Sequence, residues 1–271
     1  MLIFETVTLP LGIGTEKPFC VWHLTDLHLM HADGRDGAYE NEHARARIPV
    51  FPSAHTMEEE LLAAFQNAEE KPDFLLLTGD IIDFPTQANL DALTALLRAA
   101  GCPYLYVPGN HDWSFPKGYH SEEQIQTYLP KLSAAVGQPT SFCAVMHNGI
   151  CFVGADDSRD RVSTDVAEKT AEVLAACKEK HIPAVVCLHV PIQSAALDPE
   201  AKRVWRAPVV IGDERADEAT RAFCDAVEEN ANAVIAGHVH FTHDAPLDRG
   251  RCTQYISPLS AGGTVRKYYI V

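Results

Sequence analysis

Short runs of Val, Leu and Ile alternate along the chain with longer amphipathic stretches. Each run is bounded by Pro, Gly or Asn and has the length of a strand. We therefore expect strands at residues 20–25, 74–78, 104–107, 184–188 and 233–236. The N-terminal stretch through Gly14 predicts a further strand and turn, and the runs at 252–257 and 265–271 predict strands that close the chain.

The amphipathic stretches predict helices. The first, at residues 57–71, begins after Thr56, a suitable N-cap, and ends before Pro72. We expect the others at residues 87–100, 121–136, 165–181 and 217–230. Strands that alternate with helices indicate an α/β fold with at least partly parallel sheets.

One segment breaks this alternation, because two apolar runs meet at Asn148-Gly149. Asn-Gly is typical of a type I′ turn, which needs positive φ at both positions, so we expect an antiparallel hairpin. Two mixed sheets packed face to face with helices outside would accommodate both patterns. A single domain over residues 1–271 is long enough for such a core.

Two long stretches lack regular patterning. Residues 30–55 and 190–216 contain several Pro residues among charged ones, and we interpret both as functional loops or lids. Their role is left open by the sequence.

Composition and charge narrow the class of protein. No run approaches the roughly 18 apolar residues of a membrane span, and the N-terminus lacks the basic start of a secretory signal. The net charge of −15 argues against binding to nucleic acid or to anionic membranes. The eight cysteines form no C-x-x-C and mostly lie in apolar runs, which favours buried thiols in a reducing cytoplasm.

Side chains that can bind metals follow five of the predicted strands. In α/β sheets, ligands bind outside the carboxyl ends of the strands, so five strand ends can converge on one site. The segments concerned are Asp26-Leu27-His28, Gly79-Asp80, Gly109-Asn110-His111-Asp112, His189 and Gly237-His238-Val239-His240.

The spacing within these segments favours shared coordination. Residues i and i+2 of an extended segment face the same side, so we expect Asp26 and His28 to face one centre, and likewise His238 and His240. The glycines before Asp80, Asn110 and His238 permit tight turns that bring the strand ends close.

The candidate ligands comprise four imidazoles, two carboxylates and one amide oxygen. Alone, each has an ordinary structural reading: His189 as a buried core histidine, and Gly79-Asp80 as a turn. Together they exceed one tetrahedral site and suit two metal ions with a bridging carboxylate. The mixed N/O set favours Mn, Fe, Zn, Co or Ni. The candidates are Asp26, His28, Asp80, Asn110, His189, His238 and His240.

The order D-x-H, G-D-x-x-D, G-N-H-D, an isolated His and G-H-x-H resembles the calcineurin-like metallophosphoesterases. The resemblance spans Asp26 to His240. It implies a four-layer α/β/β/α sandwich of two mixed sheets, with a dinuclear metal site at the carboxyl edge of the strands. It also implies that Asp80 bridges the two ions. By motif, Asp26, His28 and His240 would bind one ion, and Asn110, His189 and His238 the other.

The same resemblance implies a hydrolytic mechanism. A hydroxide activated by two metals would attack phosphorus. His111 would protonate the leaving oxygen, and Asp83 would orient its ring. We expect Asp112 to support the loop, and a catalytic effect of this residue is the open alternative.

Two departures from the protein Ser/Thr phosphatases narrow the branch. Phe84 stands where those enzymes have Arg, and Asp112 stands where they have Glu. "GNHDW" and "ADDS" look like the class III cyclic-nucleotide phosphodiesterases and the glycerophosphodiesterases. We therefore expect a phosphodiesterase for a small organic phosphate such as a cyclic nucleotide. A phosphomonoesterase, a nucleotide pyrophosphohydrolase or a non-catalytic metal-binding scaffold are the alternatives, and the oligomeric state is left open.

Candidates for substrate contacts come from the 190–216 segment. Its basic and aromatic residues could cover a phosphate or a base, although a solvated loop is the plain alternative. They are Lys202, Arg203, Trp205 and Arg206. Trp113 follows His111 closely and either lines the pocket or packs in the core.

Overall fold

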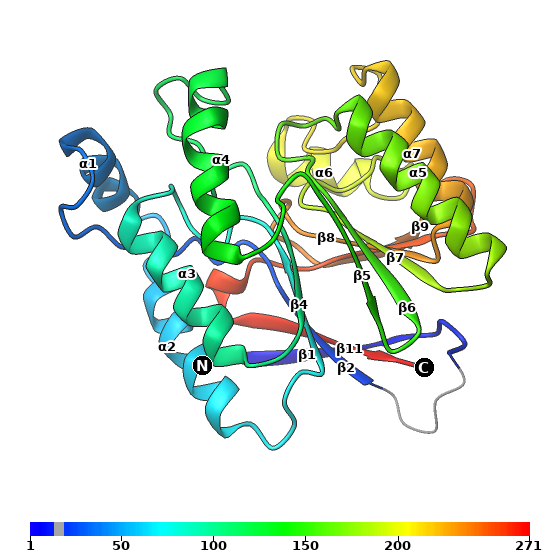
Figure 1. Cartoon of the computed structure of the whole chain (residues 1–271), viewed down its shortest axis with the longest axis horizontal. Coiled ribbons are helices and arrows are strands. Elements are labelled where there is room, and N and C mark those ends of the chain that lie inside the picture. Colours follow the sequence, from blue (N-terminus) through cyan, green and yellow to red (C-terminus); the bar gives the residue numbers. More distant parts are fainter. Residues whose placement is uncertain (14–18) are drawn as a thin grey trace.

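Two mixed sheets lie face to face, with helices on both outer sides (Figure 1). The computed structural model describes residues 1–13 and 19–271. The first sheet has the order β1-β11-β2-β3-β4, formed by β1 (Ile3–Leu9), β11 (Thr264–Ile270), β2 (Phe19–Leu24), β3 (Phe74–Thr78) and β4 (Tyr104–Val107). The second has the order β5-β6-β7-β8-β10-β9, formed by β5 (Phe142–His147), β6 (Ile150–Ala155), β7 (Ala184–Cys187), β8 (Ala233–Ala236), β10 (Thr253–Ile256) and β9 (His243–Pro246).

The strands that lead to the candidate ligands are parallel to their neighbours. Strands β2, β3 and β4 run parallel in the first sheet, and β6, β7, β8 and β10 run parallel in the second. The antiparallel pairs are β11 with β2, β5 with β6, and β10 with β9. Parallel strands bring their carboxyl ends to the same edge of each sheet, as the sequence predicted.

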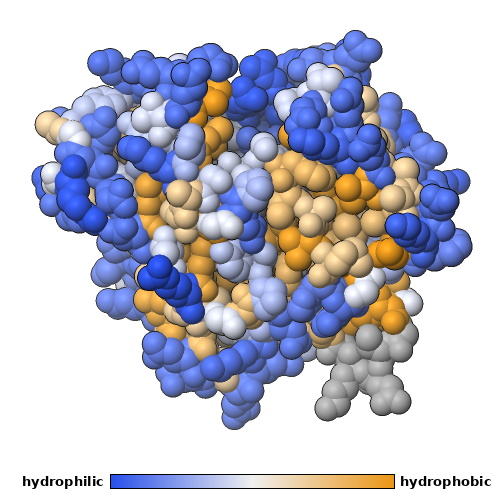
Figure 2. Space-filling view, viewed as in Figure 1, coloured by the Kyte–Doolittle hydropathy of each residue, from blue (hydrophilic) through white to orange (hydrophobic). Residues whose placement is uncertain are grey.

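The helices form the two outer layers. On the first sheet lie α2 (Ala54–Asn67), α3 (Gln87–Ala100) and α4 (Glu122–Val136), while α1 (Ala38–Arg47) lies at the margin of the molecule, apart from the sheet. On the side of the second sheet lie α5 (Thr164–Glu179), α6 (Asp198–Trp205) and α7 (Glu218–Asn230), and a short 3-10 turn, η1, covers Ser260–Gly262. Figure 2 shows hydrophilic side chains over the outer helices and hydrophobic ones gathered in the middle of the same face.

Strand β3 shows how a continuous apolar run makes two cores. Its alternate side chains point to opposite faces, so Phe74 and Leu76 join the core between the sheets. Leu75 and Leu77 join the core under α2, α3 and α4. The second sheet repeats this with the core under α5 and α7. Both faces of the central strands are therefore buried, which gives the predicted α/β/β/α sandwich.

Most of the predicted elements are confirmed. The five predicted strands and the helices at 87–100, 121–136, 165–181 and 217–230 match the structure with small differences at their ends. The hairpin turn has φ of +47° at Asn148 and +79° at Gly149, as a type I′ turn requires. The N-terminal strand is β1; Gly14, where the expected turn ends, lies outside the described residues.

Three predictions of local structure were wrong. The helix expected at 57–71 is present as α2, but its expected bounds were wrong, because α2 begins after Ser53 and not after Thr56, and it ends at Asn67. The expected loop at 30–55 contains α1, a run of ten residues without Gly or Pro. The loop at 190–216 contains α6, which Pro199 starts in its first turn. Pro52 lies just before α2 and Pro199 lies in the first turn of α6, so prolines in these segments accompany helix starts as well as irregular chain.

A buried arginine joins the two sheets. Arg266 on β11 is almost fully buried and donates to both carboxylate oxygens of Asp244 on β9, at 2.7 and 2.6 Å. It also donates to the carbonyl of Ile256 at 3.2 Å.

All eight cysteines are free thiols, and six of them are buried. Of the helices within residues 1–13 and 19–271, none is long and apolar enough to cross a bilayer.

The pair between Arg266 and Asp244 predicts a stability difference. Asp244→Ala leaves a buried guanidinium without its main partner and should lower the free energy of unfolding by about 2–3 kcal/mol. Asp225→Ala, which removes the partner of the exposed Arg249, should cost less than about 1 kcal/mol. Urea denaturation measures both, and equal losses would contradict a structural role for the Arg266 pair.

Candidate metal centre

The carboxyl ends of five strands meet in one place. The loops after β2, β3, β7 and β8 bring six predicted ligands into two clusters, and the loop after β4 brings Asn110 beside them. Within each cluster the possible ligand atoms lie within 4.8 Å of one another. The clusters are Asp26, His28 and His240, and Asp80, His189 and His238.

The interatomic distances show how closely the side chains converge. In the first cluster, Asp26 Oδ1 lies 3.2 Å from His240 Nε2 and 4.0 Å from His28 Nε2. In the second, His189 Nε2 lies 3.4 Å from Asp80 Oδ2 and 3.1 Å from His238 Nδ1. These spacings are close to those of donor atoms around a common ion.

Asn110 and Asp80 complete the arrangement. The amide oxygen of Asn110 lies 3.2 Å from His189 Nε2, so the seventh predicted ligand joins the second cluster. Asp80 Oδ2 also lies 3.9 Å from His28 Nε2 of the first cluster. One carboxylate oxygen therefore faces both clusters, the position that a bridging ligand requires.

The sequence predicts an extended backbone for the residues that present these side chains, but the structure shows left-handed residues there. Asp26 and His28 have φ of +53° and +49°, and His238 and His240 have φ of +68° and +63°. Asp80 is also left-handed, at +52°. For a residue with a Cβ this conformation costs roughly 1 kcal/mol or more, and such residues cluster at functional sites. The i and i+2 residues share a centre because the chain curls there.

Hydrogen bonds between neighbouring loops hold the curled backbone. The amides of Asp26 and His28 donate to the carbonyls of Gly79 and Asp80, at 3.0 and 2.9 Å. The amide of Gly237 donates to the carbonyl of His189 at 3.1 Å. The loops thus bind one another as the strands do, and the ligands are held in place by rigid backbone.

Asp112 is the centre of this loop network. Its carboxylate accepts from the amides of Asp80 and Gly109 at 2.8 and 2.6 Å, and from the amide of Ile82 at 3.0 Å. The expected role of Asp112 in supporting the loop agrees with these contacts.

Several buried atoms in the clusters have no hydrogen-bond partner among the described residues. They are Asp26 Oδ1 and both ring nitrogens of His28. Buried polar atoms are nearly always paired, so unpaired ones need an explanation. Asp26 Oδ1 and His28 Nε2 face each other within the first cluster, and a bound cation would satisfy both. His28 Nδ1 is on the other side of the ring, 3.8 Å from Asp83 Oδ2.

The protonation states also suit metal binding. His189 Nδ1 lies 2.8 Å from the carbonyl of Thr78, which can only accept, so Nδ1 carries a proton and Nε2 is the nitrogen that faces the cluster. Burial lowers the pKa of His28 to about 4 and that of His238 to about 3, so both rings are neutral near pH 7. Burial opposes ionisation of Asp80, but His189, His111 and His28 hold its pKa well below the usual range. His28 and His238 are therefore neutral imidazoles, and Asp80 is an ionised carboxylate. Burial lowers the pKa of His189, but Asp80, Asp26 and Asp157 outweigh it and raise the pKa well above the usual value, so a metal ion would displace a proton from this ring.

Beside the clusters, His111 and Asp83 form a hydrogen-bonded pair. His111 Nδ1 lies 2.6 Å from Asp83 Oδ1, and the other oxygen of Asp83 accepts from Arg47 Nε at 2.8 Å. Burial lowers the pKa of His111, but Asp80 and Asp83 outweigh it and raise the pKa overall. Because Nδ1 is held by a carboxylate, Nε2 is the ring nitrogen left to exchange a proton with a substrate.

Three residues of this region were missed in the sequence. Arg47 ends α1 and contacts Asp83, while Phe51 stacks on His28 with ring centroids 4.0 Å apart. The hydroxyl of Tyr119 accepts from Asn110 Nδ2 at 2.8 Å, which turns the amide oxygen towards His189. The run of good helix formers at residues 38–47 was the available signal for the first two, since it predicts a helix inside the supposed loop.

Of the candidates for substrate contacts, Trp205 lies beside the site, whereas Trp113, Arg203 and Arg206 do not line it. Trp113 is fully buried and donates to Ser158 Oγ at 2.9 Å, so it packs in the core and does not line the site. Arg203 pairs with Glu200 on the exposed side of α6, and Arg206 is exposed at the end of that helix. Trp205 does reach the site, because its Nε1 donates to the carbonyl of Val239 at 2.8 Å and its ring lies 5.2 Å from that of His240.

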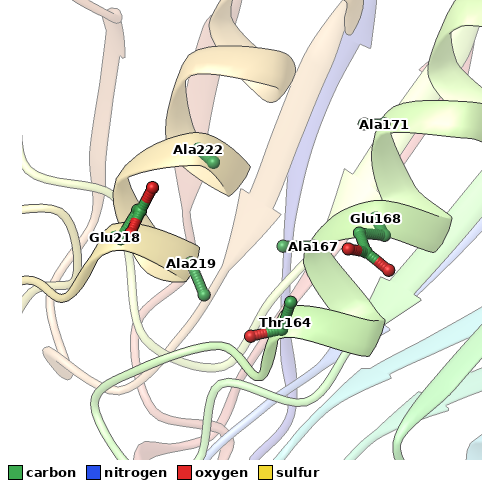
Figure 3. Close-up of a pocket in the computed structure, with 7 residues that line it drawn as sticks. All are labelled: Thr164, Ala167, Glu168, Ala171, Glu218, Ala219 and Ala222. Carbon is green, nitrogen blue, oxygen red and sulfur yellow. The ribbon is translucent and has the colours of Figure 1, made fainter.

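A separate cavity of about 410 Å³ lies between α5 and α7. Alanines such as Ala167, Ala171 and Ala222 line it, together with Glu168 and Glu218 (Figure 3). It contains none of the candidate ligands, and its lining offers carboxylates and methyl groups only weakly suited to a phosphate ester.

Comparison with known proteins agrees with this geometry. The sequence model of the family described as calcineurin-like phosphoesterase matches residues 20–241. A probable cyclic nucleotide phosphodiesterase of Moraxella catarrhalis is 32% identical over 122 residues, which cover 45% of this chain and 37% of the relative. An uncharacterized protein of Schizosaccharomyces pombe is 28% identical over 142 residues, which cover 49% of this chain and 25% of the relative. The chain thus spans well under half the length of these relatives.

Solved structures show the same fold. The crystal structure of a dimetal phosphatase from Danio rerio superposes with a TM-score of 0.53 at 15% identity. The match covers 90% of this chain and 88% of that one. The likeness extends over nearly the whole sandwich.

The close approach of Gly237 to the first cluster predicts a loss of metal. A Cβ at this position would lie 1.8 Å from Thr25 Oγ1 and 2.7 Å from Asp26 Oδ2. Gly237→Ala should displace the Asp26 carboxylate and weaken metal binding by roughly 10- to 100-fold. Gly250→Ala, where nothing lies within 4 Å, is the control and should retain the metal. Metal content after dialysis measures this effect. Equal retention of metal by Gly237→Ala and Gly250→Ala would show that metal binding does not need the close contact between Gly237 and Asp26.

Proposed function

The chain belongs to the calcineurin-like phosphoesterase family, whose members are metal-dependent hydrolases, and from that premise we propose that it is a phosphodiesterase for a small organic phosphate such as a cyclic nucleotide. The observation that carries the proposal is the junction of two ligand clusters at Asp80 beside the His111–Asp83 pair. The partial similarity to a probable cyclic nucleotide phosphodiesterase supports a phosphodiester as the class of substrate.

We assign the ligands by cluster. Asp26, His28 and His240 would hold one ion, and Asn110, His189 and His238 the other, with Asp80 between them. The mixed nitrogen and oxygen donors favour Mn, Fe, Zn, Co or Ni. When bound, two such ions would supply positive charge for the phosphate oxygens and would lower the pKa of a water held beside them.

His111 is the proposed general acid. Asp83 accepts from Nδ1 and so fixes the ring, which leaves Nε2 to donate a proton to the leaving oxygen. Arg47 holds the second oxygen of Asp83, so the carboxylate cannot rotate away from His111. The ring is partly exposed, with 26% of its side-chain surface accessible, as a group that meets substrate must be.

Two aromatic side chains flank His240 and would receive the non-reacting part of the ester. The ring of Trp205 lies 5.2 Å from that of His240, and the ring of Phe51 lies 6.3 Å from it. Flat apolar walls suit a base or another planar group. The free cysteines support a reducing compartment such as the cytoplasm as the place of action.

Activity on two chromogenic esters tests the reaction class. With Mn²⁺ added, we expect bis-p-nitrophenyl phosphate to be hydrolysed with at least about tenfold higher kcat/KM than p-nitrophenyl phosphate. The reverse preference would indicate a phosphomonoesterase. No hydrolysis of either ester by protein with full metal occupancy would indicate a non-catalytic scaffold.

Replacing His111 tests the acid. His111→Ala should retain the bound metal and lose about 10²- to 10⁴-fold in rate on diphenyl phosphate, whose leaving group needs a proton. On bis-p-nitrophenyl phosphate, whose leaving group is stable as an anion, the loss should be much smaller. Steady-state rates and metal content measure both effects. Equal losses on the two esters, or collapse of the metal content, would refute the assignment.

A further inference from the structure

A second group of metal-binding side chains lies outside the proposed dinuclear centre. His31 Nε2 lies 2.8 Å from Glu58 Oε2, and His55 Nδ1 lies 3.3 Å from the same oxygen. The possible ligand atoms of these three residues all lie within 4.8 Å of one another. None of the three belongs to the metallophosphoesterase motifs found in the sequence.

The chemistry of the group suits a transition metal. Two imidazoles and one carboxylate form a familiar three-ligand set for Zn²⁺, with metal–ligand bonds of about 2.0–2.2 Å. Such bonds place tetrahedral ligand atoms about 3.4 Å apart. The 3.3 Å between His55 Nδ1 and Glu58 Oε2 matches this spacing, and the 2.8 Å between His31 Nε2 and the same oxygen would lengthen when an ion binds. We propose that His31, His55 and Glu58 form a further site for a divalent transition metal ion such as Zn²⁺.

Two of the three ligands are already held in place. The backbone amide of His31 donates to Asn89 Oδ1 at 2.5 Å, and Thr86 Oγ1 donates to the carbonyl of His31 at 2.7 Å. Glu58 lies on α2 and only 8% of its surface is exposed. His55 lies one turn before Glu58 on α2 and so presents its ring on the same face. The mostly exposed ring of His55 needs only a small movement to complete the set.

The site has room for a further ligand. A cavity of about 240 Å³ is lined by His31 and His55 together with Met30, Ile48 and Phe51. Three protein ligands leave the fourth position of a tetrahedral ion open, and this cavity can supply a water there.

Phe51 joins this site to the dinuclear centre. Its ring lines the cavity and also stacks on His28, with a centroid distance of 4.0 Å and an interplanar angle of 3°. The same connection begins at Arg47, which pairs with Asp83. An ion held between His31 and α2 would therefore fix residues 47–55 against the dinuclear centre. This role follows from the contacts and does not depend on which ester is hydrolysed.

Counting bound zinc tests the site. The full chain, stripped with chelator and dialysed against buffered Zn²⁺, is compared with His55→Ala and with His181→Asn, which removes another exposed histidine. We expect His55→Ala to bind one zinc ion fewer than the wild type, and His181→Asn to bind as many as the wild type. Glu58→Gln should lose the same ion. The test is the difference in bound zinc between the wild type and His55→Ala. The total zinc bound by the wild type shows separately whether the dinuclear centre is filled.

The outcomes separate a metal site from a hydrogen-bonded cluster. If His55→Ala and Glu58→Gln bind as much zinc as the wild type, the three residues only share hydrogen bonds and the proposal is wrong. Hydrogen exchange supplies a readout besides the count. The wild type, but not His55→Ala, should exchange the backbone amides of residues 47–58 more slowly when the additional zinc binds. Unchanged exchange in the wild type would overturn the proposed link to the dinuclear centre.

Discussion

The close approach of backbone segments at the carboxyl edge of the two sheets is the constraint on which the rest depends. A Cβ on Gly109 would lie 2.2 Å from Asp80 Oδ1, and one on Gly79 would lie 2.5 Å from the amide of Gly109. Only glycine permits this contact, and Gly79 also has φ of +85°. Because the loops after β3 and β4 touch, Asp80 can face both ligand clusters, and His111 can lie beside them.

Electrostatics then separates the roles of the buried acids. Asp112 is surrounded by three backbone amides and holds loops, whereas Asp26 keeps one oxygen without a partner among the described residues. Burying an acid without compensation is expensive, so the unpaired oxygen indicates where positive charge is needed. Asp83 is satisfied by His111 and Arg47, and it holds the proposed proton donor, His111, beside the clusters.

The two segments without regular patterning complete the site. Residues 30–55 contribute α1, whose last residue reaches Asp83, and Phe51, which covers His28. Residues 190–216 contribute α6, whose Trp205 is held by the carbonyl between the two histidines of G-H-x-H. The family motifs provide the candidate ligands, while these segments determine what surrounds them.

The sequence by itself determined the fold and the seven residues that meet at the centre. Short apolar runs bounded by Pro, Gly or Asn indicate which segments are strands. Parallel strands bring their carboxyl ends to the same edge of a sheet. It could not show that Asp26, His28, His238 and His240 are left-handed, because the loop hydrogen bonds that impose this come from residues far away along the chain. Nor could it distinguish Trp113, buried in the core, from Trp205, beside His240. Both are tryptophans near motif residues, and only packing in three dimensions decides which one water and substrate can reach.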